Sequence, residues 1–93
     1  PAIAVDSAEP ITDDKGAQRL SVTVSNTGTR HAILGNLKLS VTGGGQSVTM
    51  APEQLEGMTG ANVLAGATRR FSVPWPESLP VGPIQVGLDF EPL

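Results

Sequence analysis

Apolar and polar residues alternate most regularly in two segments of this chain. In residues 19–26 and 84–91, every second side chain is aliphatic or aromatic, and the residues between them are mostly polar or glycine. The apolar positions are Leu20, Val22, Val24, Ile84, Val86, Leu88 and Phe90. A period of two is typical of a β-strand that turns one face to the core. Both segments are therefore predicted to be strands with these residues inward.

Residues 31–42 follow the same rule with one break. The positions predicted to face inward are Ile33, Leu37, Leu39 and Val41. Leu34 is out of phase with them, which indicates a β-bulge near Gly35. We therefore expect a third long strand that is irregular near its start.

Shorter patterns fill the rest of the chain. Strands are predicted at residues 2–5, 46–50, 62–65 and 67–73, and residues 52–60 are predicted to hold one helical turn. Residues 6–16 form a polar connection with a turn at 13–16, and residues 43–45, all glycine, form a hairpin tip. Prolines make residues 74–80 a stiff extended loop.

These elements indicate a single all-β domain. Six to eight short strands in 93 residues, with frequent turns from 11 Gly and 8 Pro, are typical of an antiparallel sandwich. No stretch of more than ten residues has a helical period. We predict an immunoglobulin-like antiparallel two-sheet β-sandwich that spans residues 1–93.

Composition excludes several functions. The net charge is −3, whereas a nucleic-acid-binding face needs a basic surface. No apolar window is long enough for insertion into a membrane. Cysteine is absent, which rules out thiol catalysis and metal sites with Cys ligands. We expect no cofactor, no nucleic-acid partner and no membrane insertion.

The sequence contains no set of residues typical of catalysis or metal binding. The one histidine, His31, follows a turn and has no second ligand or base at a suitable spacing, so a surface role is favoured. Glu9, Asp13 and Asp14 are close in sequence but lack the alternating spacing of a calcium loop, and a solvated turn is favoured. We predict no catalytic residue, no metal site and no enzyme.

Three side chains are candidates for contact with a partner. Alternation places Arg69 on the same face as Phe71, at the rim of the core, and Arg70 on the opposite face. Trp75 stands between two prolines, where it either closes one end of the sandwich or presents an aromatic surface to a sugar or a proline-reading domain. A local structural role is favoured for all three, with partner contact as the alternative.

Two motifs resemble a known family. Asn26-Thr27-Gly28 is followed by His31 and a leucine-containing strand, and residues 63–71 read Val-Leu-Ala-Gly-Ala-Thr-Arg-Arg-Phe. In this order the motifs resemble the second domain of archaic-type periplasmic chaperones of the chaperone–usher pathway. The resemblance covers nearly the whole chain, although each motif is short and none is catalytic.

The resemblance implies a function in pilus assembly. Such chaperones have two immunoglobulin-like domains, act in the periplasm, bind pilus subunits and deliver them to an outer-membrane usher. They complete the fold of the subunit by β-augmentation, with a strand of the first domain. The second domain forms one wall of the cleft, so this chain is expected to be a fragment that lacks an N-terminal domain. Pro1, Ala2 and Ile3 are then expected at the domain interface, with Glu77 facing the cleft.

Two other classes of function stay open. One is an immunoglobulin-like adhesin or carbohydrate-binding module, for which Trp75 is the residue to test. The other is a spacer domain of a cell-surface protein. An enzyme is the least favoured of these interpretations.

Overall fold

The chain folds into two packed antiparallel sheets. The computed structural model describes residues 2–92 and, for Pro92, the backbone alone; 58% of the described residues are in strands. The strands are β1 (Ile3–Thr12), β2 (Gln18–Asn26), β3 (Ala32–Gly43), β4 (Gln46–Met50), β5 (Asn62–Val63), β6 (Thr68–Pro74) and β7 (Gln85–Pro92), and one 3-10 turn, η1, covers Pro52–Gln54. This architecture confirms the predicted all-β class and is compatible with an immunoglobulin-like sandwich.

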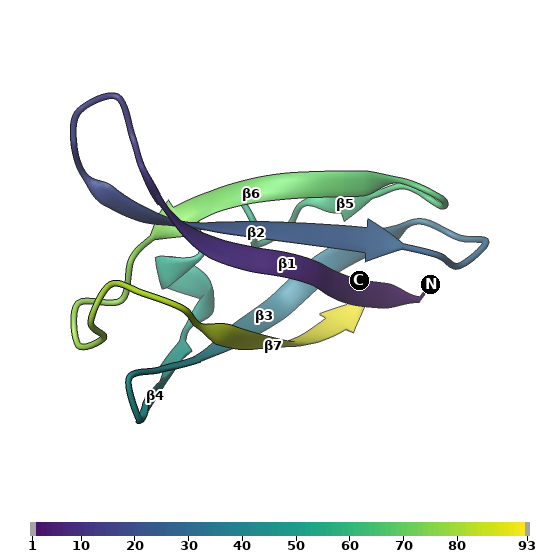
Figure 1. Ribbon diagram of the computed structural model, residues 1–93. Coiled ribbons are helices and arrows are strands. Elements are labelled where there is room, and N and C mark those ends of the chain that lie inside the picture. Colours follow the sequence, from purple (N-terminus) through teal and green to yellow (C-terminus); the bar gives the residue numbers. More distant parts are fainter. Residues whose placement is uncertain (1, 93) are drawn as a thin grey trace.

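The first sheet has the order β1-β2-β6, and the second is built around β3 (Figure 1). In the second sheet, β3 pairs with β7 along one edge and with β4 and β5 at its two ends. The central strands β2 and β3 supply most of the core. Their fully buried side chains are Leu20, Val22, Val24, Leu34, Leu37, Leu39 and Val41.

The first strand is much longer than expected. Residues 6–12 were predicted as a polar connection, but β1 continues to Thr12 and pairs with β2 along its whole length. A register shift between Val5 and Ser7 breaks the alternation, which hid the strand in the sequence. Pro10 is tolerated because β1 lies at the edge of its sheet, where a missing N–H costs little.

The predicted bulge in β3 is confirmed, but one inward position is wrong. The register with β7 shifts between Gly35 and Lys38, and Asn36 has φ 44°. Because the bulge lies after Leu34, this leucine and not Ile33 faces the core before the bulge; Leu34 is fully buried and Ile33 only half-buried.

Several short elements are confirmed. Gly44 and Gly45 both have positive φ at the tip of the β3–β4 hairpin, as a two-residue turn of the mirror-image type requires. The single helical turn expected in residues 52–60 is η1. The turn at residues 13–16 is closed by the Asp13 carboxylate, which accepts hydrogen bonds from the backbone N–H groups of Lys15 and Ala17.

Candidate functional site

One end of the sandwich is held together by a buried amide. Asn26 ends β2 and is only 1% exposed. Its Oδ1 accepts hydrogen bonds from the backbone N–H groups of Ala2 and Gly28, at 3.2 and 3.0 Å. Its Nδ2 donates to the carbonyl oxygens of Arg30 and Val63, at 2.8 and 3.0 Å. The Asn26 side chain therefore connects the start of the chain, the β2–β3 turn and β5, which belongs to the other sheet.

Backbone hydrogen bonds reinforce this end. The Asn26 N–H donates to the Ala67 carbonyl at 3.0 Å, and Gly66 N–H donates to the Asn26 carbonyl at 2.8 Å. Thr27 N–H donates to the Ala2 carbonyl at 2.9 Å. The segment around Asn26 and residues 63–71 thus meet at one end of the sandwich, beside Ala2. We call these contacts the Asn26 clamp.

The sequence interpretation did not assign a role to this asparagine beyond a turn. An Asn at the end of an alternating strand, just before Thr-Gly, marks a turn as readily as a buried hub. Its partners Val63 and Ala67 lie about forty residues further along the chain. Only the folded arrangement of the two sheets brings them together.

An exposed apolar side chain lies beside the clamp. Leu64, in the turn between β5 and β6, is 59% exposed. At the opposite end of the sandwich, Val81 is exposed to the same extent. Single exposed apolar residues are common on protein surfaces, so neither one defines a binding site by itself.

The structure does not bring the predicted interface residues together. Ala2 is exposed and Ile3 half-buried at the Asn26 end, and Pro1 lies outside the described residues. Glu77 is exposed in the loop after β6, which begins where β6 pairs with the start of β2, at the other end of the sandwich. In Figure 1 this loop and the N-terminus are at opposite ends of the molecule. One domain interface at the Asn26 end therefore does not include Glu77.

Arg69 and Arg70 lie on opposite faces of β6, as alternation predicted. The Arg69 guanidinium lies over the Phe71 ring, 4.9 Å from its centroid, and donates to the Asn62 carbonyl at 3.0 Å. The head of this rim arginine thus contacts an aromatic ring and a backbone oxygen. Arg70 is exposed opposite Thr23 on the outer face of its sheet.

Trp75 is tied into its own loop. Its indole Nε1 donates to the Leu79 carbonyl at 3.0 Å, and the ring packs against the core. The half-buried ring also lines a pocket of about 380 Å³ together with two prolines and polar groups. The other lining residues are Val48, Met50, Gln54, Pro74, Pro76, Glu77 and Ser78. The contacts of Trp75 favour the interpretation in which it closes an end of the sandwich.

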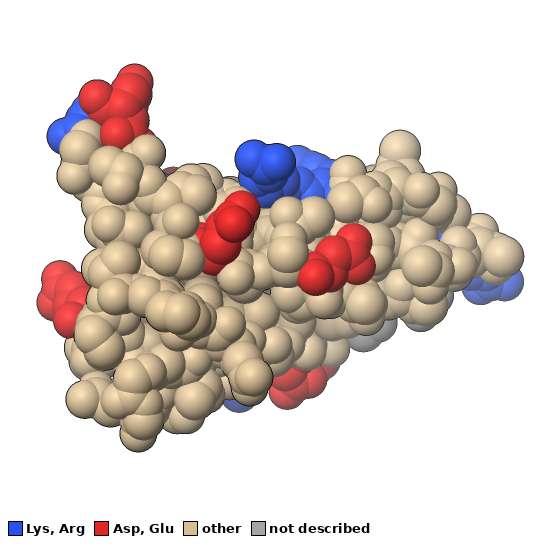
Figure 2. All heavy atoms as spheres, in the orientation of Figure 1, with Lys and Arg blue, Asp and Glu red and all other residues tan. Residues whose placement is uncertain are grey.

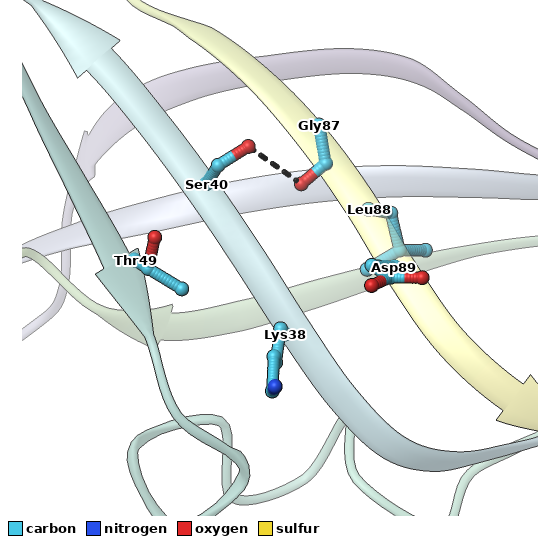
Figure 3. A pocket seen from close by; sticks show the side chains of 6 residues that line it. All are labelled: Lys38, Ser40, Thr49, Gly87, Leu88 and Asp89. Carbon is cyan, nitrogen blue, oxygen red and sulfur yellow. Dashed lines mark hydrogen bonds between the residues drawn. The ribbon is translucent and has the colours of Figure 1, made fainter.

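A second hollow lies on the outer face of the sheet built around β3. It has a volume of about 360 Å³ and is lined by Lys38, Ser40, Thr49, Gly87, Leu88 and Asp89 (Figure 3). Lys38 and Asp89 are cross-strand neighbours in the register of β3 with β7. Ser40 Oγ donates to the Gly87 carbonyl at 3.3 Å. Its lining combines the charged Lys38 and Asp89 with the hydroxyl groups of Ser40 and Thr49 and the apolar Leu88.

The other residues considered for catalysis or metal binding do not lie close to one another. His31 is exposed before β3, and Glu9 lies on β1, away from the Asp13 turn. Within residues 2–92 no three His, Asp or Glu side chains are grouped as a metal site requires. No helix in the same range has the length and hydropathy needed to cross a bilayer.

Comparison with known proteins identifies no relative of this chain. No protein-family model, no curated protein and no solved structure matches this chain.

Proposed function

We propose that the chain is the second domain of a periplasmic chaperone that binds pilus subunits and delivers them to an outer-membrane usher. In this function the domain forms one wall of the subunit cleft and keeps a fixed angle to the domain before it. The proposal rests on the sequence resemblance and on one structural observation, the Asn26 clamp.

The clamp supports the proposal because it stiffens the point of entry into the domain. A buried side chain with four hydrogen bonds costs several kcal/mol to disrupt, so the first residues leave the sandwich in one direction. A domain that serves as a wall needs such a fixed exit. A flexible tether would need no buried contact there.

Leu64 supplies the apolar contact that this arrangement needs. It lies next to the clamp and is 59% exposed. Interfaces between domains of one chain are usually modest in area and partly polar, so we assign the apolar centre of this one to Leu64, with the polar groups of the clamp around it. We propose that Leu64 packs against the preceding domain.

The first experiment is to purify the protein from its natural source and determine its intact mass and N-terminal sequence. The proposal predicts a secreted chain about twice this length, with a second sandwich pattern before Pro1. A mature protein that begins at Pro1, or one made of tandem copies of this domain, would contradict it.

A second experiment tests the interface in the longer protein. We expect Leu64→Ser to loosen the two domains, measured as a larger radius of gyration in small-angle scattering. Val81→Ser is the matched control, because Val81 is equally exposed at the other end. Equal effects of both substitutions, or none from Leu64→Ser, would contradict the role of Leu64.

A carbohydrate-binding module is the second candidate, and the pocket beside Trp75 favours it. The indole and the Gln54, Glu77 and Ser78 side chains line the same hollow, and an aromatic ring next to polar groups suits a sugar. Glu77→Gln combined with Ser78→Ala tests this function without removing the structural indole. Glycan-array binding that this double variant abolishes would support the module and not the chaperone.

A further inference from the structure

Strand β7 has a partner on only one of its two edges. It pairs with β3, and no other strand within residues 2–92 pairs with it. In a constant-type immunoglobulin sandwich the two sheets have the orders A-B-E-D and C-F-G. Here β1-β2-β6 correspond to A-B-E, and β3-β7 correspond to C-F. The free edge of β7 is thus the position at which strand G pairs in the complete sandwich.

The apolar side chains along this edge are only partly covered. The inward-facing residues of β7 and the residue before it are half-buried, as are three residues of β1. These residues are Ile3, Val5, Ala8, Ile84, Val86, Leu88 and Phe90. In Figure 1, β1 and β7 run along the front of the sandwich, one from each sheet. Their partial exposure leaves apolar surface that a further strand would cover.

The edge of β7 is better suited to an added strand than the edge of β1. Residues 85–91 contain no proline, so each supplies a backbone N–H and a carbonyl oxygen. Pro10 interrupts the row of N–H groups in β1. The edge of β6 is also without a strand partner among the described residues, but its inward Phe71 and Val73 are already buried. Of β1, β6 and β7, only β7 combines a continuous backbone edge with half-buried apolar side chains.

Both strands at this opening carry acids and no bases. Asp6 and Glu9 lie on β1, and Asp89 and Glu91 lie on β7. All four are exposed. In Figure 2, acidic side chains occupy the middle of the face with β1 and β7, and Lys and Arg side chains appear only at its margins.

We infer that β7 binds one extended strand of a partner polypeptide, in which apolar side chains alternate with Lys or Arg. Backbone hydrogen bonds to β7 provide the affinity, as in β-augmentation. The apolar side chains of the partner pack against the half-buried residues of β1 and β7. Its basic side chains lie on the outer face, where Asp89 and Glu91 are their neighbours. This surface reaches the Asn26 end at Ile3, which pairs with Asn26, but the inference does not depend on the proposed function.

A second copy of this chain is a poorer occupant. Pairing of β7 with β7 or β1 of another copy would bring acids next to acids, which disfavours pairing. The one edge strand with two bases is β6, which carries Arg69 and Arg70. Its apolar residues are buried in its own core and are unable to fill the opening of another molecule.

The test uses three synthetic peptides of the length of β7, which has 8 residues. In the Lys peptide valine alternates with lysine, and in the Glu peptide valine alternates with glutamate. The block peptide has the composition of the Lys peptide with all valines before all lysines. Calorimetric titration measures affinity, and backbone NMR shifts locate the contact.

We expect the Lys peptide to bind one per chain, at least about tenfold more tightly than either of the others. NMR shifts should be concentrated in β7 and β1. The double substitution Asp89→Asn and Glu91→Gln should lower the affinity for the Lys peptide by about tenfold. The control Glu53→Gln and Glu56→Gln changes the net charge equally at two exposed residues outside these strands, and it should leave the affinity within about twofold.

Four results would overturn the inference. They are no binding of the Lys peptide, equal binding of the block peptide, equal weakening by the two double substitutions, and NMR shifts outside β1 and β7. A dimer in sedimentation that buries β7 would assign the edge to a second copy. In one further outcome, the 93-residue chain binds the Lys peptide and the protein from its natural source does not. That result would show that another segment of the same polypeptide occupies the edge of β7.

Discussion

The two long sides of this sandwich are closed in different ways. On the side away from β7, residues 52–63 fill the space between β3 and β6, with Leu55, Met58 and Val63 fully buried. Backbone hydrogen bonds join Leu34 to Gly60 and Ala61 there. On the β7 side, no comparable segment within residues 2–92 covers the edge, and the inward side chains remain half-buried. We call these the closed side and the open side.

The comparison shows that alternation predicts which side chains face the core but not how completely they are buried. Residues 84–90 alternate as regularly as residues 20–24, and both sets turn apolar side chains toward the core. Val22 and Val24 are nevertheless fully buried, whereas Val86 and Leu88 are not. Burial depends on neighbours from elsewhere in the chain, and β2 has a strand on each side while β7 has one.

The largest effect should come from the closed side. We expect Leu55→Ala to lower the free energy of unfolding by about 2–5 kcal/mol, because it leaves a cavity in the fully buried core on the closed side. Urea denaturation measures this loss. A cost below about 1 kcal/mol would show that residues 52–60 do not close this side.

The second largest loss of stability should come from disrupting the Asn26 clamp, because the clamp joins both sheets. We expect Asn26→Ala to cost about 2–4 kcal/mol, since it leaves buried backbone groups without partners. Amide exchange should quicken at Ala2, Gly28 and Gly66. A loss of stability without faster exchange at these residues would contradict the clamp.

Asn26→Asp separates the acceptor and donor roles of the amide. The carboxylate keeps an acceptor for Ala2 and Gly28 but faces the Arg30 and Val63 carbonyl oxygens. Burial should raise the folded-state pKa of this aspartate above its unfolded value. The variant should then be most stable below the unfolded pKa and lose stability as the pH rises through the folded pKa. A stability that does not change with pH, relative to the parent chain, would contradict this arrangement.

Leu88→Ala tests the open side and should cost less than Leu55→Ala. We expect about 1–2 kcal/mol, because a half-buried leucine loses less transfer free energy and leaves no closed cavity. Urea denaturation of both variants under the same conditions gives the comparison directly. Equal losses would mean that the two sides do not differ in burial energy.

The smallest loss of stability should come from substitution of Arg69. We expect Arg69→Ala to cost at most about 1 kcal/mol, from the contact with the Phe71 ring and the hydrogen bond to Asn62. Arg70→Ala is the control on the same strand, and it should be nearly neutral. A larger loss from Arg70→Ala would contradict the assignment of Arg69 as the side chain that holds the rim.

Local patterns predicted most elements but not their lengths or partners. Residues 19–26 and the Gly43-Gly44-Gly45 hairpin follow from alternation and turn chemistry, and both are present. The extent of β1 was missed because its bulge breaks the period and Pro10 resembles a strand terminator. The Asn26 clamp depends on contacts that no local pattern contains. The open side was not predicted either, because it depends on sheet order and not on any one strand.

Hydrogen exchange at single-residue resolution, with and without the Lys peptide, tests the contrast between the two sides most directly. In the free chain, the amides of β2 and β3 should exchange most slowly, and those of residues 85–91 that do not bond to β3 should exchange rapidly. Adding the Lys peptide should slow the exchange of these β7 amides and leave residues 52–63 unchanged. Full protection of β7 in the free chain, or no change in β7 with the peptide bound, would contradict an open side that accepts a strand.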